Sequence, residues 1–281
     1  MDANILDKKI AQLTKVITSM NDGKGPDVLG VCEVENAHVL GLLADAISQN
    51  GSRYQVVHHD GKDARGIDVA FFVRKGDFKI GKTFSHEILK RSATRDLFQV
   101  NLTVGQKTLI LIGNHWPARS SGQYESEPYR IIAGETLSYF HERIQSIHGK
   151  DVAVIAMGDF NDEPFNRSLT DYALAERSKS KVLNSRSPKF YNAMWDILGS
   201  GDATHFYNNA PNLLDQILIS KGLLSGKSGI KADIDSVKIF KHPDMISSGK
   251  YPSPIRFGRQ NKINLKGFSD HLPIRMKIDI L

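Results

Sequence analysis

Apolar residues recur at two different spacings along this chain, and each spacing predicts a different secondary-structure element. Spacings of three and four residues over 5–20, 36–50 and 129–147 predict amphipathic helices, and a shorter helical stretch is expected near 168–176. Apolar runs and alternating apolar and polar residues predict strands, mostly separated by turns that contain glycine. The predicted strands are 28–34, 54–58, 67–73, 78–84, 98–104, 107–112, 152–156, a segment that ends at 219, 234–240 and 273–278.

Many strands joined as hairpins, with helices between them, favour two sheets packed face to face beneath outer helices. Neither a repeat nor a low-complexity linker divides the chain, and 40% hydrophobic residues can build a sizeable core. We therefore predict that residues 1–281 form a single domain. No apolar run approaches the roughly 20 residues that a membrane-spanning helix needs, so we expect a soluble protein. No signal peptide is visible at residues 1–4; the compartment stays open, because an export signal could lie upstream of residue 1.

The overall charge favours an anionic partner without identifying it. The formal net charge is +6 and the pI is near 9.2, whereas 24% charged residues of both signs is ordinary for a soluble surface. The segment 241–267 is rich in lysine and arginine, and it is either a solvated surface loop or a basic wall that grips a polyanion. The single cysteine, Cys32, has no partner for an internal disulfide, and its apolar flank predicts a small buried side chain rather than a nucleophile.

Polar residues with catalytic potential follow or precede the predicted strands directly. The motif 157–164 comes after a buried apolar run, and its Asp159 and Asn161 point to the same side of an extended segment. Asp270 and His271 stand just before the last predicted strand. Carboxylates are hard ligands for Mg²⁺ or Mn²⁺, and a histidine held by a second carboxylate can donate to a phosphoryl oxygen. Taken alone, an Asp-x-Asn sequence is usually a turn and an Asp-His pair is usually structural.

Other polar residues occupy comparable positions. Glu33 ends an apolar strand and is a candidate metal ligand, and Glu35 is the alternative candidate for that role. His115 follows the strand 107–112. Asp215 lies among leucine and isoleucine residues, where a carboxylate needs a partner such as an imidazolium.

These motifs, in this order, resemble those of the endonuclease/exonuclease/phosphatase superfamily, whose members have the deoxyribonuclease I-like fold. The matching segments are 27–34 with Glu33, 112–116 with His115, 157–164 with Asp159, 214–218 with Asp215, and 269–273 with His271. The resemblance implies a four-layer α/β/β/α sandwich with two packed mixed or antiparallel sheets flanked by helices. It also implies Mg²⁺- or Mn²⁺-dependent hydrolysis of a phosphoester.

The resemblance further implies a role for each matched residue. Glu33 and Asp270 are expected to bind the metal, and Asp159 to orient or deprotonate the attacking water. Asn161 is expected to fix that water and contact the phosphate. The other implied catalytic residues are His271 on the phosphoryl group, Asp215 holding His271, His115 as phosphate donor or general acid, and Asp68 as the acidic partner of His115. The candidate substrate contacts are Asn114, Arg130, Arg65 and Arg95; Asn114 and Arg130 could instead support the site from beneath, and any of the arginines could be a surface charge.

One departure concerns the beginning of the chain. The superfamily starts with a central strand that ends in an asparagine, whereas this chain starts with the helix that follows it, so Asn4 is given no role. Either an upstream strand is missing or the site works with one ligand fewer.

Three functions remain open. The leading hypothesis is a nuclease-type phosphodiesterase that acts on DNA or RNA as a monomer, with no protein partner implied. The alternatives are a phosphomonoesterase or lipid-headgroup or inositol phosphate hydrolase on the same fold, and a catalytically silent binding domain.

Overall fold

The computed structural model describes residues 3–48, 53–63, 65–248, 252–259 and 262–281. Its main elements in chain order are α1 (Ala3–Ser19), β1 (Val28–Val34), α2 (Ala37–Ile47), β2 (Tyr54–His58), β3 (Asp68–Arg74), β4 (Lys79–His86), β5 (Leu97–Val104), β6 (Lys107–His115), α3 (Gln123–His148), β7 (Ala153–Asp159), β8 (Ala175–Glu176), α4 (Lys179–Asn184), β9 (Phe190–Asn192), β10 (His205–Tyr207), β11 (Ala210–Asn212), β12 (Asp215–Ser220), α5 (Lys221–Ser225), β13 (Ile230–Ile239), β14 (Gly258–Arg259), β15 (Lys262–Ile263) and β16 (Ile274–Ile280).

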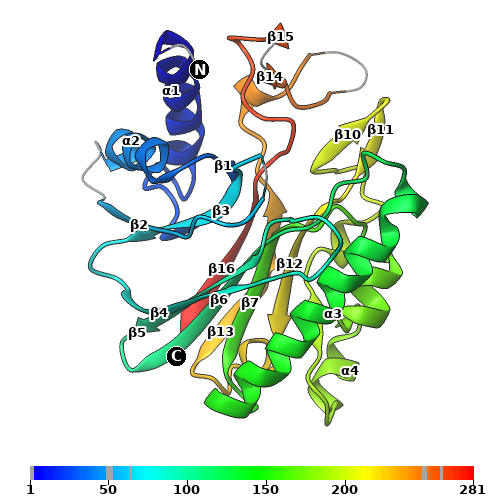
Figure 1. Ribbon diagram of the computed structural model, residues 1–281. Helices are drawn as coiled ribbons and strands as arrows, with labels where there is room; N and C mark the ends of the chain where they lie inside the picture. Colours follow the sequence, from blue (N-terminus) through cyan, green and yellow to red (C-terminus); the bar gives the residue numbers. More distant parts are fainter. Residues whose placement is uncertain (1–2, 49–52, 64, 249–251, 260–261) are drawn as a thin grey trace.

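Two β layers lie face to face between helices (Figure 1). One layer is a seven-stranded sheet with the order β4-β5-β6-β7-β12-β9-β8, and the other consists of the sheet β1-β3-β2 and the pair β13-β16. The largest hydrophobic core lies between them and includes Phe71, Leu111 and Ile217. Helix α3 packs on the outer face of the seven-stranded sheet, and α1 and α2 pack on β1-β3-β2. The predicted four-layer sandwich of mixed α/β class is therefore confirmed.

The alternation of side chains along β6 and β7 decides which residues reach the space between the layers. Leu111 of β6 lies in the core between the sheets, whereas Ile112 packs beneath α3. In β7, Ile155 also lies between the sheets. Counting on in steps of two from these residues leads to His115 at the end of β6 and Asp159 at the end of β7. Both side chains therefore face the space between the layers where the strands end.

The hydrophobic periodicity located the longer elements but misplaced some boundaries. Helix α2 begins as expected after Asn36, whose side chain accepts a hydrogen bond from the Val39 amide at 3.0 Å. Helix α3 begins at Gln123, well before the predicted start at 129. The predicted helical stretch 168–176 forms only a π-helical turn, Ser168–Tyr172, followed by β8. The strands β9, β10 and β11 were not predicted, because three-residue segments carry too little periodicity.

None of the helices in the described parts of the chain has both the length and the apolar composition needed to cross a bilayer. The expectation of an upstream strand concerns residues before Met1 and stays a prediction. Within the described residues, β1 pairs with β3 and β16 pairs with β13.

Candidate active site at the end of the seven-stranded sheet

Three neighbouring strands bring three predicted catalytic residues into one row. In the parallel pair β6–β7, His115 lies opposite Asp159, and in the antiparallel pair β7–β12, Asp159 lies opposite Asp215. Residues in register on adjacent strands project on the same side of a sheet. The row His115–Asp159–Asp215 thus follows directly from the strand pairing.

His271 reaches this row from the segment before β16. Its Nδ1 atom lies 2.7 Å from Oδ2 of Asp215, which is the predicted pairing. Burial opposes a charge on the imidazole, but Asp215, and then Asp159 and Asp270, outweigh it and raise the pKa of His271 to about 10. His271 is therefore a cation at neutral pH. Asp159, Asp215 and His271 each offer an atom within 4.8 Å of the other two.

Asp159 is a carboxylate with an unusually high affinity for protons. Burial raises its pKa to about 7, with Asp215 adding to the rise and His271 opposing it. Asn161 donates a hydrogen bond to each carboxylate oxygen of Asp159. The backbone amide of Asn161 donates to Oδ1 at 2.7 Å, and the side-chain amide of Asn161 donates to Oδ2 at 3.0 Å. A carboxylate that titrates near neutrality can accept a proton from water and release it again.

His115 faces Asp159 from the other side but differs from His271 in charge. Its Nε2 atom lies 3.7 Å from Oδ2 of Asp159. Burial, together with Arg95 and Arg65, holds the pKa of His115 well below its ordinary value, so the ring is neutral. Its Nδ1 atom is buried without a hydrogen-bond partner among the described residues.

The predicted pairing of Asp68 with His115 does not form in the part of the chain that the structure describes. Asp68 is buried at the start of β3, where it lies 3.2 Å from Nε2 of His58 and accepts a hydrogen bond from the Gly61 amide at 2.9 Å. His58 is on β2, which is hydrogen-bonded to β3, so the strand pairing supplies a nearer imidazole than His115. A catalytic role for Asp68 stays a prediction.

Glu33 and Asp270 both act electrostatically on the ammonium group of Lys9. Glu33 is the extra residue of a β-bulge between Cys32 and Val34 and has a left-handed φ of 60°. Burial lowers the pKa of Lys9, and Asp270 and Glu33 both oppose this decrease. Carboxylate oxygens are the ligands that a hard divalent cation prefers, so the two residues remain the predicted ligands of Mg²⁺ or Mn²⁺.

Arg65 and Arg95 form a basic group beside His115, held together by Asp63. Arg65 binds Asp63 with Nε at 3.1 Å and with Nη2 at 3.2 Å, and Nη1 of Arg95 lies 3.4 Å from the same carboxylate. Arg95 also donates to the Trp116 carbonyl at 2.6 Å, directly after His115. Arg65 is half-exposed and Arg95 is buried, so Arg65 has the better access to a substrate.

The prediction that Arg130 is a surface charge is wrong, whereas substrate contacts of Asn114 and Arg130 stay predictions. Both side chains are fully buried. Asn114 donates to the Ile112 carbonyl at 2.8 Å and accepts from Nε1 of Trp116 at 2.9 Å, and Arg130 forms an ion pair with Asp162 at 2.8 Å. Because α3 starts earlier than predicted, Arg130 lies inside the helix and faces the sheet. The interpretation that both residues support the site from beneath agrees with these contacts.

Two residues that sequence reasoning missed complete this side of the site. The ring of His205 lies 4.7 Å from that of His271, and burial and His271 lower the pKa of His205 to about 4, so it is neutral. Thr204 connects the two catalytic segments: its Oγ1 accepts from the Asp215 amide at 3.3 Å and its carbonyl accepts from the Leu272 amide at 2.8 Å. Neither residue stands in a motif or beside a long apolar strand, which were the signals that identified the others.

Comparison with solved structures finds proteins of the same fold. The human nocturnin catalytic domain with bound sulfate has a TM-score of 0.59 at 17% identity, over 98% of this chain and 87% of that one. D. rerio TDP2 in complex with a single-stranded DNA product has a TM-score of 0.60 at 15% identity, over 99% and 94%. The Bacteroides thetaiotaomicron mannosyl-6-phosphatase has a TM-score of 0.60 at 14% identity, over 98% and 91%. At these identities the likeness shows the deoxyribonuclease I-like fold alone.

A comparison with curated proteins finds no significant match. The family model described as "Endonuclease/Exonuclease/phosphatase family" matches residues 1–280. Because this match extends over nearly the whole chain, the protein belongs to the endonuclease/exonuclease/phosphatase family.

Proposed function

We propose that this protein is a Mg²⁺- or Mn²⁺-dependent phosphodiesterase of nuclease type, which hydrolyses DNA or RNA by attack of water on the phosphate. The observation that carries the proposal is the pairing of a proton acceptor with a fixed cation. Asp159, with a pKa of about 7, faces His271, whose pKa is about 10. A phosphoester hydrolase needs one group to take a proton from water and another to stabilise the charge that develops on the phosphoryl oxygens.

Each residue of the row has a task in this reaction. Asp159 accepts the proton of the attacking water, and Asn161, hydrogen-bonded to both oxygens of Asp159, keeps that carboxylate oriented. His271, held by Asp215, donates to a phosphoryl oxygen. His115 is a neutral donor on the opposite side of Asp159. Glu33 and Asp270 would hold the divalent ion, which would supply neutralisation of the phosphate charge.

A nucleic-acid substrate is favoured by the charge of the site and of the chain. Arg65 presents a half-exposed guanidinium beside His115, and guanidinium groups bind phosphate through paired hydrogen bonds. The net charge of +6 favours a polyanion over a small neutral substrate. The single-stranded DNA product bound to D. rerio TDP2 is in keeping with this choice.

A phosphomonoesterase is the second candidate, and the mannosyl-6-phosphatase among the structural neighbours favours it. The three side chains His115, Asp159 and His271 suit the hydrolysis of a monoester as well as that of a diester. The two activities differ in what lies beyond the scissile phosphate, so substrates distinguish them better than active-site variants do.

The test is to incubate the protein with supercoiled plasmid, single-stranded RNA, a bis-aryl phosphodiester and sugar and inositol monophosphates, in Mg²⁺, Mn²⁺ or chelator. We expect cleavage of nucleic acid that requires the metal and falls by about 10²–10⁴-fold in His271→Ala and Asp159→Asn. Phosphate release from monoesters alone would establish the second candidate instead. Inertness towards every substrate with either metal would refute both.

A further inference from the structure

Asn161 has a backbone conformation that needs support. Its φ is 51°, in the left-handed region that non-glycine residues seldom adopt, although asparagine tolerates it better than most. This conformation allows its backbone amide and side chain to reach Asp159 together, while the side-chain amide also donates to the Trp116 carbonyl at 3.0 Å. The geometry of Asp159 thus depends on what holds Asn161.

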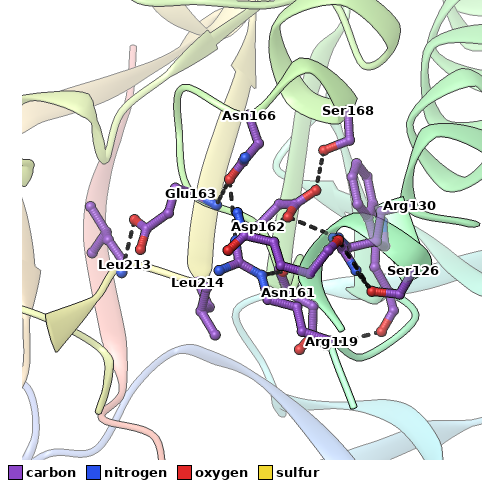
Figure 2. A network of polar contacts seen from close by, with 12 residues as sticks. Arg119, Ser126, Arg130, Asn161, Asp162, Glu163, Asn166, Ser168, Leu213 and Leu214 are labelled. Atoms are coloured by element: carbon purple, nitrogen blue, oxygen red, sulfur yellow. Dashed lines mark hydrogen bonds and ion pairs between the residues drawn. The ribbon is translucent and has the colours of Figure 1, made fainter. Parts of the chain in front are cut away.

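Arg119 holds Asn161 through the backbone carbonyl group of that residue. Its Nε donates to the Asn161 carbonyl at 2.6 Å, and its Nη2 donates to Oδ1 of Asp162 at 3.0 Å and to Oδ1 of Asn166 at 3.2 Å. The planar fork of a guanidinium fixes these directions together, which the single ammonium group of a lysine does not. Figure 2 shows this fork beneath the loop.

Asp162 anchors the contact to α3. Its carboxylate is completely buried, accepts a hydrogen bond from Ser168 Oγ at 2.5 Å and lies 2.8 Å from Nε of Arg130. Arg130 in turn donates to Ser126 Oγ at 2.6 Å, within α3. One buried carboxylate therefore lies between two guanidinium groups, and it costs little only while both are present. The loop is fixed to a long helix rather than to solvent-exposed groups.

The same loop also touches the segment that leads to Asp215. Glu163 accepts a hydrogen bond from the Leu213 amide at 3.0 Å (Figure 2), and Gln216 donates to the Asp162 carbonyl at 3.1 Å. A shift of the loop would therefore change the positions of both Asp159, the proposed proton acceptor, and Asp215, which holds His271.

We propose that Arg119 is a positioning residue of the active site, which keeps Asn161 in its left-handed conformation and so directs the Asn161 amide at Asp159. The inference rests on the proposed function for its kinetic consequence but not for its structural one. Arg119 was not singled out by sequence reasoning, because it follows a motif rather than standing within one.

The test compares Arg119→Lys with a matched control, Arg74→Lys. Arg74 has a similarly covered side chain, 17% exposed against 19% for Arg119, and it also pairs with an aspartate and with backbone carbonyl groups, at the far end of β3. We expect Arg119→Lys to lower kcat by about ten- to hundredfold with KM within about threefold of the wild type. Arg74→Lys should leave kcat unchanged at a comparable decrease in Tm.

A second measurement does not need activity. In ¹⁵N-labelled protein, the side-chain amide signal of Asn161, assigned by its loss in Asn161→Asp, should move in Arg119→Lys and stay in place in Arg74→Lys. An unmoved signal with wild-type kcat would overturn the inference, and so would equal losses of kcat in both variants. If the wild type cleaves no phosphoester while the signal moves, the proposed function fails and the positioning role stands.

Discussion

Two imidazoles lie on either side of Asp159, yet His271 is charged and His115 is neutral. His271 has a carboxylate, Asp215, at 2.7 Å, and its pKa rises to about 10. His115 lies 3.7 Å from Asp159, but burial, and then Arg95 and Arg65, hold its pKa well below the ordinary value. Both rings are at the ends of strands or beside them. The difference shows that burial and the charged groups around each ring, rather than the shared carboxylate of Asp159 alone, decide its charge.

This difference assigns separate tasks to the two rings. A permanent imidazolium stabilises negative charge throughout the reaction without having to gain a proton first. A neutral imidazole donates only through the ring nitrogen that carries its hydrogen. The most direct test of this difference is to weaken the positive charge of His271 while keeping its imidazole ring.

Asp215→Asn does this with the fewest other changes. Without this carboxylate the largest charged group that raises the pKa of His271 is lost, so that pKa falls and the positive charge is weakened. We expect kcat to fall by about 10³-fold or more, as when a histidine loses its orienting carboxylate elsewhere. Steady-state cleavage assays measure this. Asp60→Asn, which changes an exposed carboxylate 3.7 Å from His58, is the control and should retain full activity; a loss below tenfold in Asp215→Asn would contradict the assignment.

The charge of His271 should also appear in the pH dependence of stability. The folded protein holds this proton more tightly than the unfolded chain does, since the pKa rises from 6.5 to about 10. The resulting stabilisation is complete below pH 6.5 and is lost as the pH rises through 10. We expect the free energy of unfolding to decrease by about 4 kcal/mol more in the wild type than in His271→Gln between pH 6.5 and 10. Urea titrations at several pH values measure it, and parallel curves for both proteins would contradict it.

The sequence identified His271 and its partners better than it identified the surroundings of His115. Asp159, Asp215 and His271 were located because each stands next to an apolar strand in a motif that resembles one of the superfamily's, and strand ends at one edge of a sheet converge. The partner of Asp68 was missed, since His58 and His115 are both at strand ends and only the sheet order distinguishes them. The β-bulge at Glu33 could not be predicted, because one extra residue in a strand does not change the pattern of apolar positions enough to be recognised.

Buried polar residues mark the limit of such reasoning. Hydropathy treats Arg130 and Asn114 as surface groups, yet both are fully covered because Asp162 and Trp116 supply their partners. Asp162 comes from a segment distant from Arg130 in sequence, whereas the partner of Asn114, Trp116, follows it closely. The position of His205 beside His271 likewise depends on a short hairpin that carries no pattern of its own.

His115→Gln tests the neutral side directly. The amide keeps a donor near Asp159 but changes its position, so we expect kcat to fall by about ten- to hundredfold. The shape of the pH–rate profile between pH 6 and 9 should not change, because a group that is already neutral there contributes no limb. Loss of a limb in the variant would show that His115 titrates and would remove the contrast with His271.

Arg65→Gln should have the smallest effect on activity. It tests most directly which groups keep His115 neutral while His271 is charged. Arg65 contributes to the low pKa of His115 but ranks behind burial and Arg95, so its removal should raise that pKa while leaving the ring neutral at pH 7. NMR titration of the His115 ring protons measures the shift, and Arg143→Gln, on the exposed side of α3, should leave it unchanged. Because the guanidinium is also a proposed phosphate contact, KM should rise by about tenfold with little change in kcat. If the His115 titration stays in place while KM rises, Arg65 serves the substrate alone, and burial with Arg95 suffices to keep the ring neutral.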